Sequence, residues 1–395
     1  MKRQAYDHAG GNDNSCQHHP DGQVAFAQLF DLIEAWSEDV ENLDDHSQRH
    51  SHCQGREYCP GERTPEFKHK LLHDKSSRSC SLGFPLSRRA PSKQGAKLRK
   101  GKFLGIKGAS RTEEYVFHQL EEFIYPDSLS HAVLKKQEYG EAAAAIAGGT
   151  EIVPNLPPSI RCLIDVTRLG LNYIREEPGQ VRIGATTTMH DIALSPIVAR
   201  FANGLLSASC CQGWPRQIRN TATLGGNLVG AGPFADSPPA LLALEAEAVI
   251  ARASGEETVG LNQFFLDYRQ TAVGDGILKE IRFPIPGPQV RGAFLKFSRT
   301  QVDQALVNVA VCLELEHGLC QRVRIALGAV DRTPRRLPEA ERALAGKPLQ
   351  SDQIENVASI VREMVDPIID FRASADYRRE IAGVLTRRAL FQIAS

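Results

Sequence analysis

A dozen residues near the middle of the chain say most about its fold: Gln217-Ile218-Arg219-Asn220-Thr221-Ala222-Thr223-Leu224-Gly225-Gly226-Asn227-Leu228. The glycine pair at 225 and 226 lets the backbone adopt positive φ and approach a ligand, so that its amide N–H groups can face an anion. An earlier stretch, Ala147-Gly148-Gly149-Thr150-Glu151, has the same character. We interpret both as strand-to-turn loops that hold one diphosphate from two sides. Taken singly, each glycine pair is also explained by an ordinary tight turn.

The longer stretch, together with the Ala235-Asp236-Ser237-Pro238-Pro239 that follows it, resembles the FAD-binding subunits of molybdenum hydroxylases. These are the medium subunit of carbon monoxide dehydrogenase and the flavin domain of the xanthine dehydrogenase family. The similarity begins near Tyr115 and continues to the C-terminus. Further matching pieces lie in the family's order: Leu163-Ile164-Asp165-Val166, Ile183-Gly184-Ala185-Thr186-Thr187, Phe264-Phe265-Leu266-Asp267-Tyr268 and Ile325-Ala326-Leu327-Gly328-Ala329-Val330.

The resemblance implies an α+β protein with a PCMH-type FAD-binding fold, in which two α/β subdomains hold FAD between them. That unit is expected at 113–287, with subdomains at about 113–169 and 170–287, and a C-terminal α+β domain of the carbon monoxide dehydrogenase flavoprotein type at 288–395. The residues themselves show regular αβ alternation from Glu113 onward. Strands are expected at 142–147, 161–166, 181–185, 248–251, 292–297, 307–315 and 323–330. Helices are expected at 128–138, 188–198 with an interruption near Pro196, 239–246, 338–345, 351–365 and 373–391.

Residues 1–112 differ from the rest of the chain, and the resemblance does not extend into them. Eight of the 12 histidines and four of the nine cysteines fall there. Only Phe26, Leu29, Phe30, Ile33 and Trp36 share a helical face, and 88–111 is basic and glycine-rich like a linker. We predict a largely disordered extension, or an upstream region translated from a misplaced start codon.

Composition narrows the possible partners and location. With 47 basic and 47 acidic residues, the chain gives no reason to expect a nucleic acid or an anionic membrane. No uncharged apolar run reaches the length of a bilayer span, and the polar N-terminus is not a secretory signal. The nine cysteines are scattered without a Cys-x-x-Cys pair, which favours a reducing cytoplasm and disfavours an iron–sulfur cluster on this chain. No metal site is predicted.

In the family, the two glycine loops bind the FAD diphosphate, and the resemblance carries that role to the matching residues. Backbone N–H groups of 147–151 and the Thr150 hydroxyl would donate from one side, and N–H groups of 223–227 from the other. Arg219 and Asn220 would anchor the second loop or the cofactor. A solvated charge followed by an Asx turn is the alternative for these two residues.

Three further residues match cofactor positions of the family. Asp236 would accept hydrogen bonds from ribityl or ribose hydroxyls, although it could instead cap a helix before Pro239. Leu278 would pack on the isoalloxazine ring, unless it is a core leucine. Lys296 would lie near the ring and stabilise the reduced, anionic flavin, unless it is an exposed edge-strand lysine. The full candidate set is Ala147, Gly148, Gly149, Thr150, Glu151, Arg219, Asn220, Thr223, Leu224, Gly225, Gly226, Asn227, Asp236, Leu278 and Lys296.

The resemblance implies an FAD-carrying electron-transfer subunit of a molybdenum-containing hydroxylase or dehydrogenase. A large subunit would hold the molybdenum cofactor, a small subunit would hold [2Fe–2S] clusters, and the flavin would deliver electrons to NAD or a quinone. No catalytic acid, base or nucleophile is expected here, because the cofactor carries the chemistry. No His or Cys stands where a covalent flavin link would be expected, so we predict non-covalent FAD.

Two other functions remain open from the sequence alone. One is a free-standing flavin oxidoreductase of the same broad fold, which would need its own substrate base. The other is a degenerate, non-catalytic scaffold subunit. The second is supported by the unusual extension and by departures from the family pattern at Asp275-Gly276, Thr300 and Gln304-Ala305. The substrate and the electron acceptor are left open.

Overall fold

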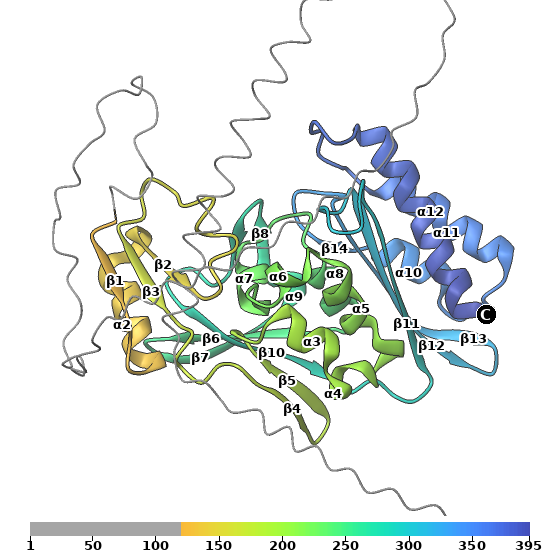
Figure 1. The fold of residues 1–395 in the computed structure, drawn as a ribbon. Coiled ribbons are helices and arrows are strands. Elements are labelled where there is room, and N and C mark those ends of the chain that lie inside the picture. The colour runs from red at the N-terminus through yellow and green to blue at the C-terminus, as the bar shows by residue number, and fades with distance from the viewer. Residues whose placement is uncertain (1–119) are drawn as a thin grey trace, which may run out of the picture. The chain divides into compact units, whose positions relative to one another are not determined.

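The computed structural model describes residues 120–395. The predicted extension, its amphipathic segment and the expected start of the FAD-binding unit at 113 lie outside the described residues. The described chain begins with a parallel three-stranded sheet in the order β1-β3-β2 (Figure 1). Its elements are β1 (Glu122–Ile124), α2 (Leu129–Tyr139), η2 (Gly140–Ala142), β2 (Ala143–Ile146) and β3 (Cys162–Asp165).

The N-terminus of α2 is fixed by a local cap. Ser128 has extended backbone angles, and its hydroxyl accepts a hydrogen bond from the backbone N–H of His131 at 3.1 Å. This is the arrangement that favours serine before a helix, because one unpaired N–H of the first turn gains an acceptor. Ala132 and Val133 then pack against the small sheet and against Ala251 and Ile277 of the next one.

The second unit is a five-stranded antiparallel sheet in the order β4-β5-β10-β6-β7. Helices cover the face that carries the main apolar core, which runs from Val181 and Ile183 on β5 to Leu241 on α8 (Figure 1). A two-stranded ribbon, β8 with β9, lies beside them. The elements are β4 (Ile174–Glu177), β5 (Gln180–Gly184), α3 (Met189–Leu194), α4 (Pro196–Ala199), η3 (Ala202–Gly204), α5 (Leu205–Gln212), α6 (Arg216–Arg219), α7 (Leu224–Val229), α8 (Ser237–Ala243), β6 (Glu247–Arg252), β7 (Gly255–Gly260), α9 (Leu261–Phe264), β8 (Phe265–Asp267), β9 (Gln270–Thr271) and β10 (Ile277–Pro284).

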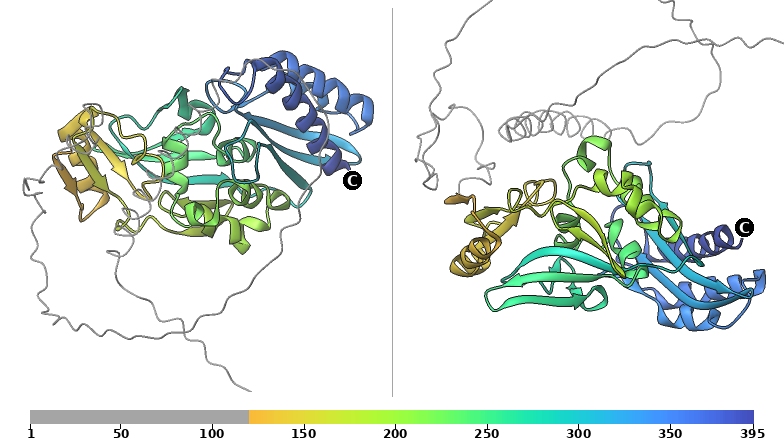
Figure 2. Two further views of the ribbon diagram at one scale, coloured as in Figure 1. Left: turned by 45° about the horizontal axis from the view of Figure 1, so that its top comes forward. Right: turned by 90° about the horizontal axis from the view of Figure 1, so that it is seen from below.

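The C-terminal unit is an antiparallel sheet in the order β11-β12-β13-β14, with helices on one side (Figure 2). Strand β12 is buried on both faces, and its side chains alternate between two cores. Val309 and Val311 belong to the cluster under the C-terminal helices, whereas Ala310 and Cys312 belong to the core of the preceding unit. The elements are β11 (Val290–Phe297), β12 (Val307–Glu316), β13 (Leu319–Gly328), β14 (Arg335–Arg336), α10 (Pro338–Leu344), α11 (Ser351–Met364) and α12 (Ala375–Ala394).

Each helix and strand expected from the sequence has a counterpart in the structure, with shifted ends. Helix α8 begins at Ser237 rather than 239, because the first turn of a helix tolerates proline. Strand β10 was not predicted. Its burial does not alternate regularly, since a register shift between Leu278 and Glu280 interrupts its pairing with β6. Among the helices of residues 120–395, none has the length and apolar character that a bilayer span requires.

Candidate cofactor site

The first glycine loop follows β2 and packs directly on the second. A Cβ atom on Gly148 would lie 1.8 Å from the carbonyl oxygen of Thr221, so no other residue fits there without moving the backbone. Gly149 has φ +72°, a conformation that glycine adopts without strain. The structure therefore brings the two loops together, as their assignment to one ligand requires.

The N–H groups of the first loop have no acceptor within the described chain. None of the hydrogen bonds among residues 120–395 uses the backbone N–H of Gly148, Gly149, Thr150 or Glu151. The Glu151 carboxylate is turned toward Arg269, at 3.0 Å. Consecutive backbone donors that have no acceptor among the described residues, in a turn that includes a left-handed glycine, are suited to an anion such as a diphosphate.

The second loop differs from the expectation that it donates in the same way. The N–H of Leu224 donates to the Thr187 carbonyl at 2.9 Å, and that of Gly225 to the Ala185 carbonyl at 2.8 Å. The N–H of Gly226 donates to the Thr223 hydroxyl at 3.1 Å, and that of Asn227 donates to the Thr223 carbonyl at 3.0 Å. These donors hold the loop on the end of β5, so the N–H groups of 224–227 already have acceptors within the protein, and a role of 223–227 in binding a diphosphate stays a prediction.

Gly226 leaves an open approach. A Cβ atom placed there would meet only the Thr223 hydroxyl, at 3.1 Å, and the residue is exposed. A Cβ atom added to Gly225, by contrast, would lie 2.7 Å from the carbonyl oxygen of Ala185 and would clash with it. The first glycine of this pair is thus required by packing, and the second is available to a ligand. The Asn227 side chain accepts a hydrogen bond from Ser237 at 2.6 Å.

Arg219 anchors a loop, which is one of the two roles expected of it. Its guanidinium donates to the carbonyl of Cys211, and more weakly to those of Gly213 at 3.5 Å and Trp214 at 3.3 Å. Trp214 has φ +43°, an unfavourable value for a residue with a side chain. Arg219 therefore helps to hold a strained segment in place. Asn220 ends α6 and is exposed.

Asp236 and Lys296 form a buried ion pair, which the sequence alone does not indicate, and their contacts with a cofactor stay predictions. Their charged atoms lie 2.8 Å apart, and their side chains are only 2% and 3% exposed. Asp236 is the N-cap residue of α8 but makes no capping hydrogen bond, and both its oxygens are occupied within the protein. Lys296 is on the edge strand β11 but is not exposed to water.

Asn308 completes this cluster. Its amide nitrogen donates to Asp236 Oδ1 at 2.8 Å and to the Ala235 carbonyl at 3.1 Å. Lys296 also donates to the Gln212 carbonyl at 3.2 Å. Burial raises the pKa of Asp236, while the Lys296 ammonium and the Asn308 amide oppose that rise. Asn308 is not among the residues predicted for the site, although a polar residue inside the apolar run Val307-Asn308-Val309-Ala310-Val311 is a usable signal.

A pocket of about 590 Å³ lies at this cluster. It gathers two candidates, Arg219 and Lys296, that are far apart in the sequence. Its remaining walls come from the end of α5 and from the turn after β11: Cys211, Gln212, Trp214, Phe297, Ser298, Arg299, Thr300, Gln301 and Val302. Leu278 is not among its lining residues; it is 5% exposed and belongs to the main apolar core. Its contact with a flavin ring stays a prediction.

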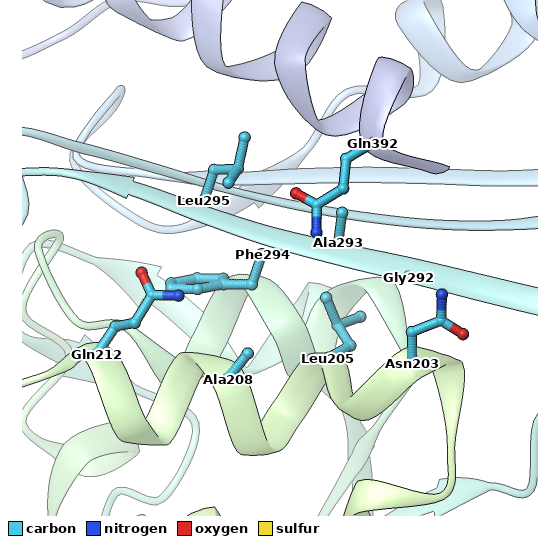
Figure 3. A pocket seen from close by; sticks show the side chains of 9 residues that line it. All are labelled: Asn203, Leu205, Ala208, Gln212, Gly292, Ala293, Phe294, Leu295 and Gln392. Carbon is cyan, nitrogen blue, oxygen red and sulfur yellow. The ribbon is translucent and has the colours of Figure 1, made fainter. Parts of the chain in front are cut away.

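A smaller cavity of about 240 Å³ separates α5 from β11 (Figure 3). Phe294 points from β11 toward α5, whereas Leu295 points to the opposite side of the strand, where α12 contributes Gln392. Gln212 lines both the cavity and the larger pocket. Strand β11 thus contributes side chains to two cores, Phe294 to that of the preceding unit and Leu295 to the cluster under the C-terminal helices.

Two glycine loops that pack on one another, one of them with backbone donors that have no acceptor within residues 120–395, are suited to a cofactor that carries an anionic group. Residues 117–286 match the FAD binding domain in molybdopterin dehydrogenase, and 292–393 match the CO dehydrogenase flavoprotein C-terminal domain. The chain belongs to the family of FAD-binding medium subunits of the molybdenum hydroxylases, and it is an oxidoreductase subunit.

Individual relatives agree with this assignment. The chain is 32% identical over 277 residues to the glyceraldehyde dehydrogenase medium chain of Sulfolobus acidocaldarius, covering 69% of this chain and 98% of the relative. It is 31% identical to the carbon monoxide dehydrogenase medium chain of Hydrogenophaga pseudoflava, covering 68% and 95%. It also matches the solved structure of the carbon monoxide dehydrogenase from that organism which lacks the Mo-pyranopterin moiety, with a TM-score of 0.66, 32% identity and coverage of 68% and 96%. The predicted family and α+β fold class are confirmed.

Proposed function

We propose that the chain binds FAD non-covalently and passes electrons from the [2Fe–2S] clusters of a small partner subunit to an acceptor such as NAD or a quinone. A large partner would carry the molybdenum cofactor. The medium-chain designation of the relatives supports an assembly of this kind. We place the FAD-binding unit at 113–287 and the C-terminal unit at 288–395.

The observation that carries the proposal is the row of backbone N–H groups from Gly148 to Glu151 that have no acceptor within residues 120–395. These donors fit the diphosphate of FAD, since an anion would satisfy several of them at once. Thr150 adds a hydroxyl on the same loop. Gly226 would allow close approach from the second loop, because a Cβ added there would meet only the Thr223 hydroxyl within 4 Å among the described residues outside its own helix.

The larger pocket would receive the redox end of the cofactor, with Lys296 and Arg219 in its wall. When bound, FAD supplies the one- and two-electron chemistry. The side chains here bind it, shape its pocket and set the local charge. The titratable groups that line the pocket among the described residues are Cys211, Arg219, Lys296 and Arg299, without a carboxylate or imidazole. This supports an electron-transfer subunit over a free-standing oxidoreductase, which would need a substrate base.

The first test is the visible spectrum of the purified chain, followed by acid precipitation. We expect a flavin spectrum, with all flavin released into the supernatant. A yellow pellet would contradict non-covalent binding, and a colourless protein that takes up no added FAD would favour the scaffold alternative.

Gly226 provides a sharper test of the binding mode. Alanine at this position requires only a small movement of the Thr223 hydroxyl, so the fold should be unaffected, and valine should add bulk on the open side. We expect FAD affinity to fall from glycine to alanine to valine while the melting temperature of the apoprotein stays constant. Gly232→Ala, where an added Cβ has no neighbour within 4 Å, is the matched control. Unchanged affinity in Gly226→Val would remove the second loop from the site.

The acceptor is tested separately. The flavin of the purified chain is reduced anaerobically and mixed with NAD or with a soluble quinone, and its reoxidation is followed by absorbance. Reoxidation by one of the two identifies the acceptor class. Reoxidation by neither, in a complex that contains the partner subunits, would contradict this part of the proposal.

A further inference from the structure

The charge that the pocket wall carries at Lys296 depends on two side chains rather than one. Lys296 is one of the residues that line the pocket, yet its ammonium lies 2.8 Å from a carboxylate oxygen of Asp236, and both side chains are almost fully buried. Two opposite charges held this closely and away from water compensate each other. The pocket wall at Lys296 is therefore close to neutral, although the sequence alone shows a lysine at this position.

Asn308 fixes the acidic partner. It lies opposite Lys296 in the β11–β12 pairing and is fully buried. Its amide nitrogen donates both to Asp236 and to the Ala235 carbonyl, whereas its own carbonyl oxygen has no hydrogen-bond partner among the described residues. The orientation of Asn308 is thus set by the acceptors that it serves. A buried amide left half unsatisfied is costly, which indicates that holding the carboxylate is its main role.

The same contacts join three segments at the pocket wall. Asp236 precedes α8, and Lys296 and Asn308 belong to adjacent strands of the C-terminal sheet. The Gln212 carbonyl at the end of α5 accepts a second hydrogen bond from Lys296. A Cβ on Gly213 would lie 2.9 Å from an oxygen of Asp236. The Asp236 carboxylate is therefore enclosed by these segments, and its side chain is only 2% exposed.

We propose that Asp236, held by Asn308, is a positioning residue that sets the charge Lys296 presents to the flavin. The proposal rests on the proposed function, since it requires the isoalloxazine ring to lie in this pocket. An unpaired ammonium beside the ring favours the reduced, anionic flavin, and a compensated one favours it less. Asp236 thereby lowers the midpoint potential of the flavin below the value that Lys296 alone would give, so that the reduced flavin donates electrons more readily.

The test is a double-mutant cycle with the midpoint potential of the bound flavin as readout. Asp236→Asn leaves an uncompensated ammonium and should bind reduced flavin about tenfold more tightly relative to oxidised flavin, which is a rise of about 30 mV for two electrons. Lys296→Met should move the potential in the opposite direction. The double variant, which removes both charges, should return to the wild-type value. Asn308→Leu, which changes no charge, should shift the potential in the same direction as Asp236→Asn but by less.

Ser237→Ala is the matched control, because it removes a hydrogen bond to Asn227 beside Asp236 without changing any charge. Its potential should equal that of the wild type. Melting temperatures show whether each variant is folded. If Asp236→Asn does not fold, the midpoint potential of Asn308→Leu serves as the test. A folded Asp236→Asn protein with wild-type potential would overturn the inference, as would an equal rise in the double variant. Absence of flavin from the wild-type protein would instead overturn the proposed function.

Discussion

Replacing Gly148 with alanine should separate the two glycine loops and weaken FAD binding. The added Cβ would lie 1.8 Å from the Thr221 carbonyl oxygen and 2.6 Å from its carbon, both backbone atoms that cannot rotate away. Ordinary contact begins at 3.4 Å, so the two backbones must move apart by more than an ångström. Overpacking of this kind costs about 1–3 kcal/mol, and the upper end is expected because no flexible side chain absorbs the clash.

The effect on the cofactor follows from the donors of the first loop. A hydrogen bond to a charged group contributes about 1.5–3 kcal/mol, so misplacing one N–H of residues 148–151 should weaken affinity roughly 10- to 100-fold. The measurement is a titration of the apoprotein with FAD, followed by the quenching of flavin fluorescence. The melting temperature of the apoprotein should fall as well, because the strain exists without the ligand.

Gly232→Ala serves as the comparison, since an added Cβ there meets nothing within 4 Å and the backbone φ is not positive. It should change neither the affinity nor the melting temperature. The reasoning would be refuted if Gly148→Ala bound FAD with wild-type affinity and kept the wild-type melting temperature. A lowered melting temperature with unchanged affinity would retain the packing argument but remove the first loop from the diphosphate site.

Three further outcomes are expected. Glu280→Gln should destabilise the fold by about 3–5 kcal/mol, measured by denaturant unfolding, because the fully buried carboxylate pairs with Arg182 at 2.9 Å. Burial alone would raise the pKa of Glu280, but hydrogen bonds from Arg182 and its neighbours outweigh burial and lower the pKa. The stabilisation is therefore present above the unfolded-state pKa near 4.5 and is lost as the pH falls below that value. A wild-type protein whose stability shows no such loss in acid would contradict the pairing. Cys211 is exposed in the pocket wall, so it should be alkylated readily, and bound FAD should protect it. Cys210 should not react, because it is buried and burial raises its pKa to about 12; peptide mapping by mass spectrometry distinguishes the two. Arg219→Lys should weaken FAD binding at least several-fold with little loss of stability, since lysine cannot donate to several carbonyls in the same fixed geometry; an isothermal titration indistinguishable from wild type would contradict the anchoring role.

The sequence predicts the elements of the fold well where local patterns determine them. The cap at Ser128, the interruption at Pro196 and the apolar strand that follows Leu306 are all local features, and the structure has each of them. Strand β10 escapes prediction because it pairs with β5 and β6, which are distant in sequence, and because the register shift near Leu278 breaks its alternation. Its place in the sheet depends on pairing with strands that lie outside any short stretch of the surrounding sequence.

Contacts between residues distant in the sequence also limit what can be predicted of the site. Gly148 and Gly225 are recognisable as residues that the backbone requires, but the sequence does not say which partner each one faces. The structure shows that Ala185 and Thr187, after β5, accept hydrogen bonds from the second loop. The first glycine of each pair is therefore required by packing, but only the first loop has a row of donors without an acceptor among the described residues.

The pairing of the two charged candidates cannot be predicted from the sequence. Asp236 and Lys296 are separated by 60 positions, and each alone suggests a direct contact with the cofactor. Their pairing changes the chemistry, since a buried lysine bound to a carboxylate acts through the balance of two charges rather than through one. The polar Asn308 within an apolar strand was the only local sign of this balance. Its burial opposite Lys296 explains why a strand otherwise composed of core residues retains an amide at that position.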